Sequence, residues 1–388
     1  MHPLPSASSP TLVLAQPSEA EQVRTWTQTR PWWGASYTPE AYVARERLLL
    51  GVPLARDGGM TPWILTDGSV IPDDEGQESR RPVLASCETL RKRALVRDAA
   101  DGVVRDVWAH GVASVFTYPE FRRRGYANRM MTLLGEHFAA QEAARPGDAA
   151  FSVLFSDIGT RFYAELGWTP YESTHLSFPV KPASPGSSPA AATPILDADL
   201  PAMAELDERI IRDQISRPPS DPAKTRVAIL PNLDTLRWHF AREAFMSNHL
   251  FAASPTVHGA MYTPPGAPNS RVWGLWSRNQ TGGKEHVEKN TLDFLRFVVE
   301  DEALSDEELS KAIRAIVGHA QVEAQKWLCA SMNLWNPHER VKRLVAAMAD
   351  LKARYVVRDN DSITSLRWLG PSPVAGVDWV ANEKFEWC

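Results

Sequence analysis

The sequence predicts an α/β protein of two domains, and three observations support this. With 388 residues, the chain exceeds what a single hydrophobic core usually supports. Apolar residues make up 44% of the chain and charged residues 23%, which leaves enough apolar side chains for buried cores. Segments with the apolar pattern of strands alternate with amphipathic helical segments, the order typical of a sheet covered by helices.

A break in composition divides the chain. Residues 181–194 read KPASPGSSPAAATP and consist almost entirely of Pro, Ser, Ala and Gly, so they are not suited to a packed element. We therefore expect a first domain at 1–180, a linker at 181–194 and a second domain at 195–388.

The first domain begins with a short apolar strand at 12–15. Ser18 can cap a helix that runs to about residue 29, and residues 39–50 form a second helix with proline in its first turn. Two less regular strands are expected next, at 63–66 and 83–94.

The middle of the first domain changes its period. Residues 111–117, GVASVFT, are rich in β-branched and apolar residues, which favours a buried strand. Residues 127–140 carry an apolar stripe at helical spacing: Ala127, Met130, Met131, Leu134 and Phe138. A strand at 151–155, a helix at 158–166 ended by Gly167, and a closing strand at 172–178 complete the prediction.

The second half repeats the order of elements without the same motifs. Strands are expected at 195–196, 249–253, 258–262, 271–276, 291–299, 328–334 and 354–357. Helices are expected at 200–212, 306–326 and 337–351. The order of elements in 290–347 parallels that in 111–167, so the second α/β domain can be a degenerate repeat of the first.

Charge and cysteine content limit the class of protein. The net charge of −5 and the pI near 6.1 lack the basic character of a general nucleic-acid binder. Cys87, Cys329 and Cys388 are widely spaced and odd in number, which indicates reduced thiols. The N-terminus lacks the pattern of a secretory signal, and no apolar run is long enough to span a membrane. We expect a cytoplasmic protein with no nucleic-acid or membrane partner, and the sequence does not indicate its oligomeric state.

One segment carries the clearest chemistry: VFTYPEFRRRGYANRMM, residues 115–131. A buried strand runs into a basic turn that opens a helix, and the unpaired N–H groups of a helix start attract a phosphate. Gly125 lets a phosphate oxygen approach the backbone, and Ala127 lets the helix lie close to the strand. Neither GxxxxGK[ST] nor GxGxxG is present, which weakens nucleotide hydrolysis and dinucleotide redox chemistry.

The sequence resembles the GCN5-related N-acetyltransferase (GNAT) superfamily at two places. RRRGYA, residues 122–127, matches the R/Q-x-x-G-x-G/A pyrophosphate signature, and FYAELGW, residues 162–168, resembles the family's tyrosine-bearing helix. The wider wording is similar to the fungal lysine N6-acetyltransferase branch. The resemblance implies a GNAT fold, a mixed sheet flanked by helices, with acetyl-CoA as co-substrate. By the same resemblance the donor contacts Val115, Phe116, Thr117, Arg122, Arg123, Arg124, Gly125, Tyr126 and Ala127.

The resemblance also implies an acid and an oxyanion site. Tyr163 is the candidate that gives a proton to the leaving thiolate, since a tyrosine keeps its proton at neutral pH. A backbone N–H near Phe116 or Thr117 is expected to stabilise the oxyanion. The thioester is expected between the strands that end at Thr117 and Phe155, which splay apart in this family.

Several groups could act as the base, which is needed because an amine with a pKa near ~10.4 is almost fully protonated at pH 7. His110 starts the strand where many relatives have a glutamate, Glu88 lies in a strand-like segment, and Asp157 follows the second splayed strand. The carboxylate of Cys388 is a further candidate, because the tail WVANEKFEWC is aromatic enough to dock. A chain of water molecules is the remaining alternative.

The acceptor is expected to be a small amine, with the side-chain amine of free lysine as the best single choice. In NLDTLRWHFAREAF, residues 232–245, the side chains of Trp238, His239 and Arg242 lie off the apolar stripe and could bind an amino acid. The second domain is expected to close over the first, with the amine pocket between them. No HExxH or CxxC indicates a metal site. Another amine or a peptide, or a non-catalytic acyl-CoA-binding role, are the alternatives.

Overall fold

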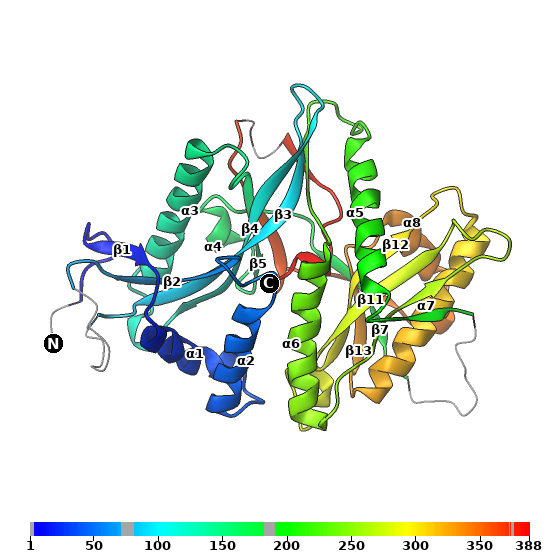
Figure 1. The fold of residues 1–388 in the computed structure, drawn as a ribbon, viewed down its shortest axis with the longest axis horizontal. Coiled ribbons are helices and arrows are strands. Elements are labelled where there is room, and N and C mark those ends of the chain that lie inside the picture. Colours follow the sequence, from blue (N-terminus) through cyan, green and yellow to red (C-terminus); the bar gives the residue numbers. More distant parts are fainter. Residues whose placement is uncertain (1–3, 71–80, 182–190, 372, 374–375) are drawn as a thin grey trace.

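The computed structural model describes residues 4–70, 81–181, 191–371, 373 and 376–388, which form two halves side by side (Figure 1). The first part of the chain contains β1 (Leu12–Ala15), α1 (Glu19–Trp33), α2 (Pro39–Gly51), β2 (Met60–Asp67), β3 (Ala85–Arg97), β4 (Val104–Thr117), η1 (Pro119–Phe121), α3 (Tyr126–Ala144), β5 (Phe151–Ser156), α4 (Arg161–Ala164), β6 (Thr169–Pro170) and β7 (Thr174–Pro179).

The second part contains β8 (Thr193–Leu196), α5 (Leu200–Ser216), β9 (Thr225–Ile229), α6 (Leu233–Phe251), β10 (Val257–Tyr262), β11 (Val272–Asn279), η2 (Val287–Lys289), β12 (Thr291–Val299), α7 (Asp306–Lys326), β13 (Ser331–Trp335), α8 (Glu339–Ala346), η3 (Ala349–Leu351), β14 (Arg354–Val357), β15 (Ile363–Trp368), β16 (Val377–Trp379) and η5 (Lys384–Glu386). Among the described residues, no helix is both long and apolar enough to cross a membrane.

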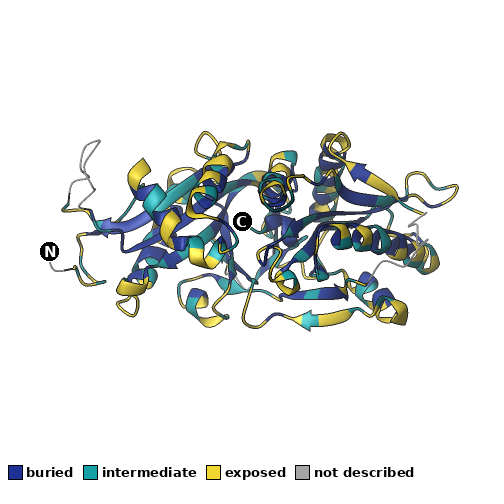
Figure 2. Ribbon diagram, turned by 90° about the horizontal axis from the view of Figure 1, so that it is seen from below, coloured by how far each residue is buried: buried dark blue, intermediate teal, exposed yellow. Residues whose placement is uncertain are grey.

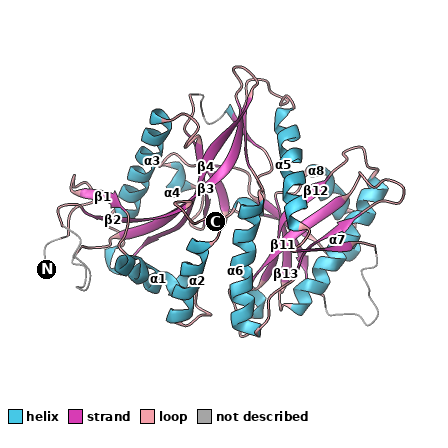
Figure 3. Ribbon diagram, in the orientation of Figure 1, coloured by secondary structure: helices cyan, strands magenta, loops and turns pink. Residues whose placement is uncertain are grey.

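Each half is built on one mixed sheet with helices against it (Figure 3). In the described chain the first sheet has nine strands, in the order β1-β2-β3-β4-β5-β15-β6, with β9 paired to β3 and β16 paired to β9. The second has seven, in the order β14-β7-β13-β12-β11-β10-β8. The predicted α/β class, a helix-flanked mixed sheet followed by a second α/β unit, is confirmed.

Local signals account for the helices that the sequence predicted well. Ser18 accepts a hydrogen bond from the N–H of Glu21 at 3.3 Å, and the Glu21 carboxylate accepts one from the Ser18 N–H at 2.8 Å. Thr38 caps α2 next to a proline at its start, and Ser305 caps α7 above three acidic residues.

Two predicted elements are wrong. The strand predicted at 249–253 is the end of α6, because its pattern of apolar residues continues the helix to Phe251. The helix predicted at 158–166 is only the short α4, and Ile158 is 60% exposed instead of sharing a buried face. Gly167, with φ of +93°, does end the turn that follows.

The two sheets exchange strands, which the sequence did not predict. The strand expected to close the first sheet, β7, instead pairs with β13 and β14 in the second. In return, β9, β15 and β16 from the second part of the chain complete the first sheet. Most of the predicted linker at 181–194 lies outside the described residues, and the domain limits drawn around it stay a prediction.

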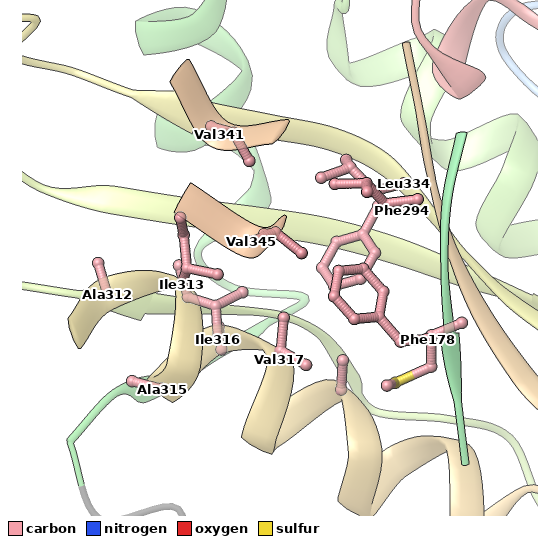
Figure 4. Close-up of a cluster of buried hydrophobic side chains, with 14 of the residues drawn as sticks. Phe178, Phe294, Ala312, Ile313, Ala315, Ile316, Val317, Leu334, Val341 and Val345 are labelled. Atoms are coloured by element: carbon pink, nitrogen blue, oxygen red, sulfur yellow. The ribbon is translucent and has the colours of Figure 1, made fainter. Parts of the chain in front are cut away.

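The two apolar clusters with the most buried residues show how the halves are held together. One lies in the second half, where Phe178 and Phe294 from the sheet face Ile313 and Ile316 of α7 and Val345 of α8 (Figure 4). The other joins the halves, since it combines residues of both sheets with residues of α5, α6 and the C-terminal tail: Phe151, Val153, Trp273, Leu275, Leu200, Leu236 and Phe385. The buried strands run through the centre of both halves (Figure 2).

Candidate active site

The turn between β4 and α3 has the backbone of an anion site. Arg123 and Gly125 both have positive φ, +61° and +82°, and α3 begins immediately afterwards at Tyr126. No side chain caps this helix, and its first turn contains no acidic residue. The first backbone hydrogen bond of α3 runs from the N–H of Arg129 to the carbonyl of Gly125. The N–H groups of residues 123–128 therefore have no backbone partner among the described residues. This turn can hold a diphosphate with its N–H groups.

The three arginines of the turn differ in their contacts: one is hydrogen-bonded to the backbone, and the other two form no ion pair with any described residue. Arg122 Nε donates to the carbonyl of Thr117 at 3.0 Å, and its guanidinium lies over the ring of Phe116. Arg123 and Arg124 are exposed and form no ion pair within the described chain. They therefore place unpaired positive charge beside the start of α3.

The strands β4 and β5 separate next to this turn. Their parallel register ends at the pair of Val112 and Leu154, whereas β4 continues to Thr117. Beyond Val112, no described strand pairs with the edge of β4 that faces β5, and the Thr117 hydroxyl is buried without a hydrogen bond to any described residue. The segment 115–117, predicted to contact the pantetheine arm, therefore lies along an open edge that leads to the turn.

A bulge reshapes β4 at the point of separation. Ser86 pairs with Phe116 and Glu88 with Ala113, so two residues of β4 face one residue of β3. Ser114, in the bulge, has φ of +53°. The bulge changes the direction of the β4 backbone at 114–115, directly before Phe116 and Thr117, where the oxyanion donor is predicted.

Tyr163 lies on α4, beside the same opening. Its ring is 8% exposed, and its hydroxyl makes no hydrogen bond to any described residue. Burial, followed by the charges of Cys87 and Asp157, raises the pKa of the Tyr163 hydroxyl above its usual value. A tyrosine that keeps its proton and has a free hydroxyl suits the predicted role of acid.

Glu88 lies on the face of the sheet opposite α3, directly beside the bulge. The residue is 7% exposed, Trp26 Nε1 donates to its carboxylate at 3.4 Å, and Ser114 also hydrogen-bonds to it. Burial, and then the negative charge of Glu46, raise the pKa of Glu88 to about 7. A carboxyl group with this pKa can accept a proton near neutral pH.

Helix α2 adds a second buried carboxylate next to Glu88. Glu46 accepts a hydrogen bond from Arg45 Nε at 2.8 Å, and both side chains are buried. The Arg45 guanidinium lies 4.5 Å from the centre of the Tyr42 ring. Arg45 and Arg242 lie near these two acids, so the region holds buried groups of both charges.

The C-terminal tail enters this interior, as the sequence predicted (Figure 1). Phe385 and Glu386 are fully buried, and Lys92 Nζ donates to the carbonyl of Glu386 at 2.6 Å. A Cβ placed on Gly111 would lie 2.7 Å from the Sγ of Cys388. The chain therefore ends on β4, one residue before the last β4–β5 pair.

The predicted acceptor residues of α6 have different roles. His239 is buried, and its Nε2 is hydrogen-bonded to the carbonyl of Phe385 at 2.9 Å. Trp238 is also buried, and its ring lies 6.2 Å from the ring of Trp387 in the tail. Both therefore hold the tail. Arg242 lies over the Trp387 ring at 5.2 Å and has no ion-pair partner in the described part of the chain.

Two base candidates lie away from this interior. His110 stacks on Phe138 of α3, on the other face of the sheet, and burial lowers its pKa to about 4. Asp157 is exposed and accepts a hydrogen bond from the Ser362 N–H at 2.9 Å. The structure thus brings Glu88, Arg242 and Cys388 together and leaves His110 and Asp157 outside the group.

Comparisons with known proteins agree with this geometry. The model of the LYC1 GNAT-like C-terminal domain matches residues 175–388, more than half of the chain. The chain belongs to the LYC1 GNAT-like family. As a member of this family it is an acetyltransferase of the GNAT type, and the resemblance found in the sequence is confirmed.

Relatives of this family member are distant in sequence. A lysine acetyltransferase of Yarrowia lipolytica is 23% identical over 288 residues, which covers 64% of this chain and 68% of the relative. The uncharacterized protein YGR111W of Saccharomyces cerevisiae is 22% identical over 409 aligned positions, 94% of this chain and 95% of the relative.

Among solved structures, a conserved protein of unknown function from Enterococcus faecalis V583, described as a probable N-acyltransferase, has a TM-score of 0.52 at 13% identity. The match covers 92% of this chain and 72% of that chain. At this level of identity the likeness concerns the fold alone.

Sequence reasoning missed part of the site of this GNAT-type protein. Glu46 and Arg45 are adjacent charged residues of a predicted helix, a pattern typical of a solvated face, yet both are buried. Nothing in the sequence indicated a buried lysine in the tail, yet Lys384 is only 8% exposed. The only signal for these residues was the high aromatic content of the tail and of the segment before α2.

Proposed function

We propose that this protein transfers the acetyl group of acetyl-CoA to the side-chain amine of free L-lysine, a small-molecule acceptor, in the cytoplasm. The observation that carries the proposal is the buried Glu88 carboxyl beside the bulge of β4. The name of the Yarrowia lipolytica relative, lysine acetyltransferase, supports the choice of acceptor.

The residues of the turn fit the donor. The unpartnered N–H groups at the start of α3 and the free Arg123 and Arg124 would hold the diphosphate. The open edge of β4 from 115 to 117 offers backbone groups to an amide-containing arm, and the orphaned Thr117 hydroxyl lies beside it. When bound, the donor supplies a thioester whose carbonyl carbon can be attacked by an amine.

Glu88 prepares the acceptor in this proposal. A lysine ammonium with a pKa near ~10.4 must lose a proton before its nitrogen can attack, and the Glu88 carboxylate accepts that proton directly or through water. Burial, and then the charge of the second carboxylate, Glu46, raise the pKa of Glu88 to about 7, so Glu88 can take up a proton near neutral pH.

The remaining groups act on the developing charges. A backbone N–H near Phe116 or Thr117 stabilises the charge on the acetyl oxygen while the new C–N bond forms. Tyr163 donates its proton to the sulfur as the C–S bond breaks, and the second proton that the nitrogen loses on becoming an amide returns to the Tyr163 oxygen through water. Glu88 releases its proton to solvent, so the transfer is balanced.

Release of free thiol from acetyl-CoA tests the proposal, with free amino acids, polyamines and short peptides as acceptors. We expect L-lysine to be preferred and the product to carry the acetyl group on the side-chain nitrogen, as shown by mass fragmentation. Preference for a peptide or another amine would overturn the choice of lysine. Acetyl-CoA binding without any acetylated product would contradict the catalytic proposal.

A further inference from the structure

Three cationic side chains share two tryptophan rings in the interior. Lys384 Nζ lies 4.1 Å from the centre of the Trp335 ring and 4.1 Å from that of Trp387. The Arg358 guanidinium lies 3.9 Å from the Trp335 ring, and that of Arg242 lies 5.2 Å from the Trp387 ring. The three cations come from the tail, from the segment after β14 and from α6, so the fold brings them together. We call Lys384, Arg358 and Arg242 the cation cluster.

The cation cluster has no ion-pair partner among the described residues. None of its members has a carboxylate within ion-pair distance, although Lys384 is 8% and Arg358 6% exposed. Nη2 of Arg358 is buried without any hydrogen-bond partner. Burial, the largest cause, lowers the pKa of Lys384 to about 8 and that of Arg358 to about 10. Unpaired buried charge is costly, so such a cluster is unusual unless an anion binds there.

Of the nearby acids, Asp361 is exposed, while Asp293 and Asp157 are already hydrogen-bonded. Asp293 accepts hydrogen bonds from Thr291 Oγ1 at 2.8 Å and from Asn333 Nδ2 at 3.1 Å. Asp157 is bound to the N–H of Ser362. These carboxylates moderate the positive potential of the cluster but do not occupy the donors of its members.

The cation cluster lies near the point where β4 and β5 separate. The Trp335 ring lies 6.0 Å from that of Phe155, near the end of β5 where β4 and β5 separate. Trp387 precedes Cys388, which packs on Gly111 of β4. Burial, and then the charges of Lys92, Glu88 and Lys384, act on the pKa of the Cys388 thiol, so the chain end is close to groups of both signs.

We propose that the cation cluster binds the carboxylate of an amino-acid acceptor, so that the substrate class is a free zwitterionic amino acid and not a simple amine. This inference rests on the proposed function, because it assumes that the amine end lies at Glu88. A carboxylate supplies the missing charge and accepts hydrogen bonds from the free Nη2 of Arg358 and from the Lys384 ammonium. Arg242, the most accessible member, faces the acceptor as it enters.

Steady-state kinetics with L-lysine and cadaverine, which has the same carbon chain without the carboxylate, test this inference. We expect Lys384→Met to raise KM for L-lysine by about 10–100-fold, the loss typical of a charge-assisted hydrogen bond, and to leave KM for cadaverine unchanged. Lys92→Met is the matched control, since Lys92 is also a buried lysine at the tail but donates to backbone carbonyls. The control is expected to affect both amines equally.

Two outcomes would overturn the inference. Equal losses with both amines in Lys384→Met would mean that the cluster serves the tail, including the chain's own terminal carboxylate. Failure of the wild-type protein to acetylate either amine would refute the proposed function alone, and calorimetry would then decide about the cluster. In that case, L-lysine binding that Lys384→Met weakens supports the carboxylate site, and no L-lysine binding to wild type contradicts it.

Discussion

The same β–α–β unit occurs in each half, and only one copy has the chemistry of a donor site. In the first, β4, α3 and β5 follow one another, with parallel pairs from Ala109–Phe151 to Val112–Leu154. In the second, β12, α7 and β13 repeat the order, with parallel pairs from Thr291–Ser331 to Phe294–Leu334. A bulge follows the last pair in both strands, at 114–115 in β4 and at Leu295 in β12. The sequence-based expectation of a degenerate repeat thus agrees with the order of elements.

The turns of the two units carry opposite charge. The first has RRRG before α3, whereas the second has EDEALS before α7, whose first turn adds Asp306, Glu307 and Glu308. The start of α7 is already capped by Ser305, and Asp306 is paired with Arg340 and Arg343. A diphosphate would be repelled by this turn and would find no free donors.

The openings beside the bulges differ as well. The edge of β4 is open, but in β12 the N–H of Phe297 donates to Glu383 of the tail at 3.0 Å, and Arg296 binds the same carboxylate. A groove of about 1020 Å³ lies along this second opening, yet its arginines are engaged in ion pairs, such as Arg226 with Asp378. Both units therefore have an opening beside the bulged strand. Whether acetyl-CoA can bind depends on the charge of the turn before the helix and on whether the tail already fills the opening.

Replacement of the base should have the largest effect. Glu88→Gln is expected to lower kcat/KM by about 10²–10⁴-fold, the usual contribution of general base catalysis. At the corresponding position of the second unit stands Trp276, fully buried, so that unit offers no substitute. Because the pKa of Glu88 is about 7, wild-type kcat/KM should rise with pH and level off above about 7.

The pH profile of the variant separates this role from a structural one. In Glu88→Gln the limb near pH 7 should disappear, because no carboxyl group remains to titrate. If Glu88→Gln keeps the rise of kcat/KM near pH 7, or keeps wild-type activity, the base is another group. The Cys388 carboxylate would then be the next candidate.

Loss of the acid should have the next largest effect. Tyr163→Phe is expected to lower kcat by about 100-fold, the lower end of the range for acid–base catalysis, while the acetyl-CoA dissociation constant stays unchanged. The hydroxyl has no partner in the described chain, so its removal should not disturb the fold. A variant with unchanged kcat would show that the thiolate leaves without this proton.

The charge of the first turn can be made to resemble that of the second. The double variant Arg123→Glu, Arg124→Glu is expected to raise KM for acetyl-CoA by about 10-fold at low salt, less at high salt, since both arginines are exposed. S-acetyl-N-acetylcysteamine, which lacks the diphosphate, should be used equally well by wild type and variant. An equal loss with both donors would mean that the arginines act on something other than the diphosphate.

The sequence predicted the parts of the site that depend on neighbouring residues. The turn at 122–127, the capping of α1 and the limits of β12 and α7 follow from spacing, charge and capping, and the structure has them. The face of the sheet on which His110 lies was not predicted, because it depends on the register between β3 and β4.

Long-range pairing explains the rest of what was missed. The exchange of β7 for β9, β15 and β16 depends on contacts between distant segments, for which periodicity carries no signal. For the same reason Lys384 could not be placed beside Trp335, because the two lie on different elements and meet only when the tail docks. Glu88 and the cation cluster therefore come close to one another only when the two halves and the tail have assembled.

A matched pair of substitutions at the starts of α3 and α7 tests the comparison at its smallest scale. Gly125→Ala places a side chain at φ of +82°, 3.1 Å from the Cβ of Ala7, at a cost of about 1–2 kcal/mol. Ser305→Ala removes a cap and costs about 1 kcal/mol.

The two losses of stability, measured by urea unfolding, should therefore be similar. Only Gly125→Ala should also weaken acetyl-CoA binding in calorimetry, because its Cβ stands where a phosphate must approach. Weaker donor binding in Ser305→Ala would show that the second unit takes part in holding the donor, and the division of roles between the two units would then be wrong.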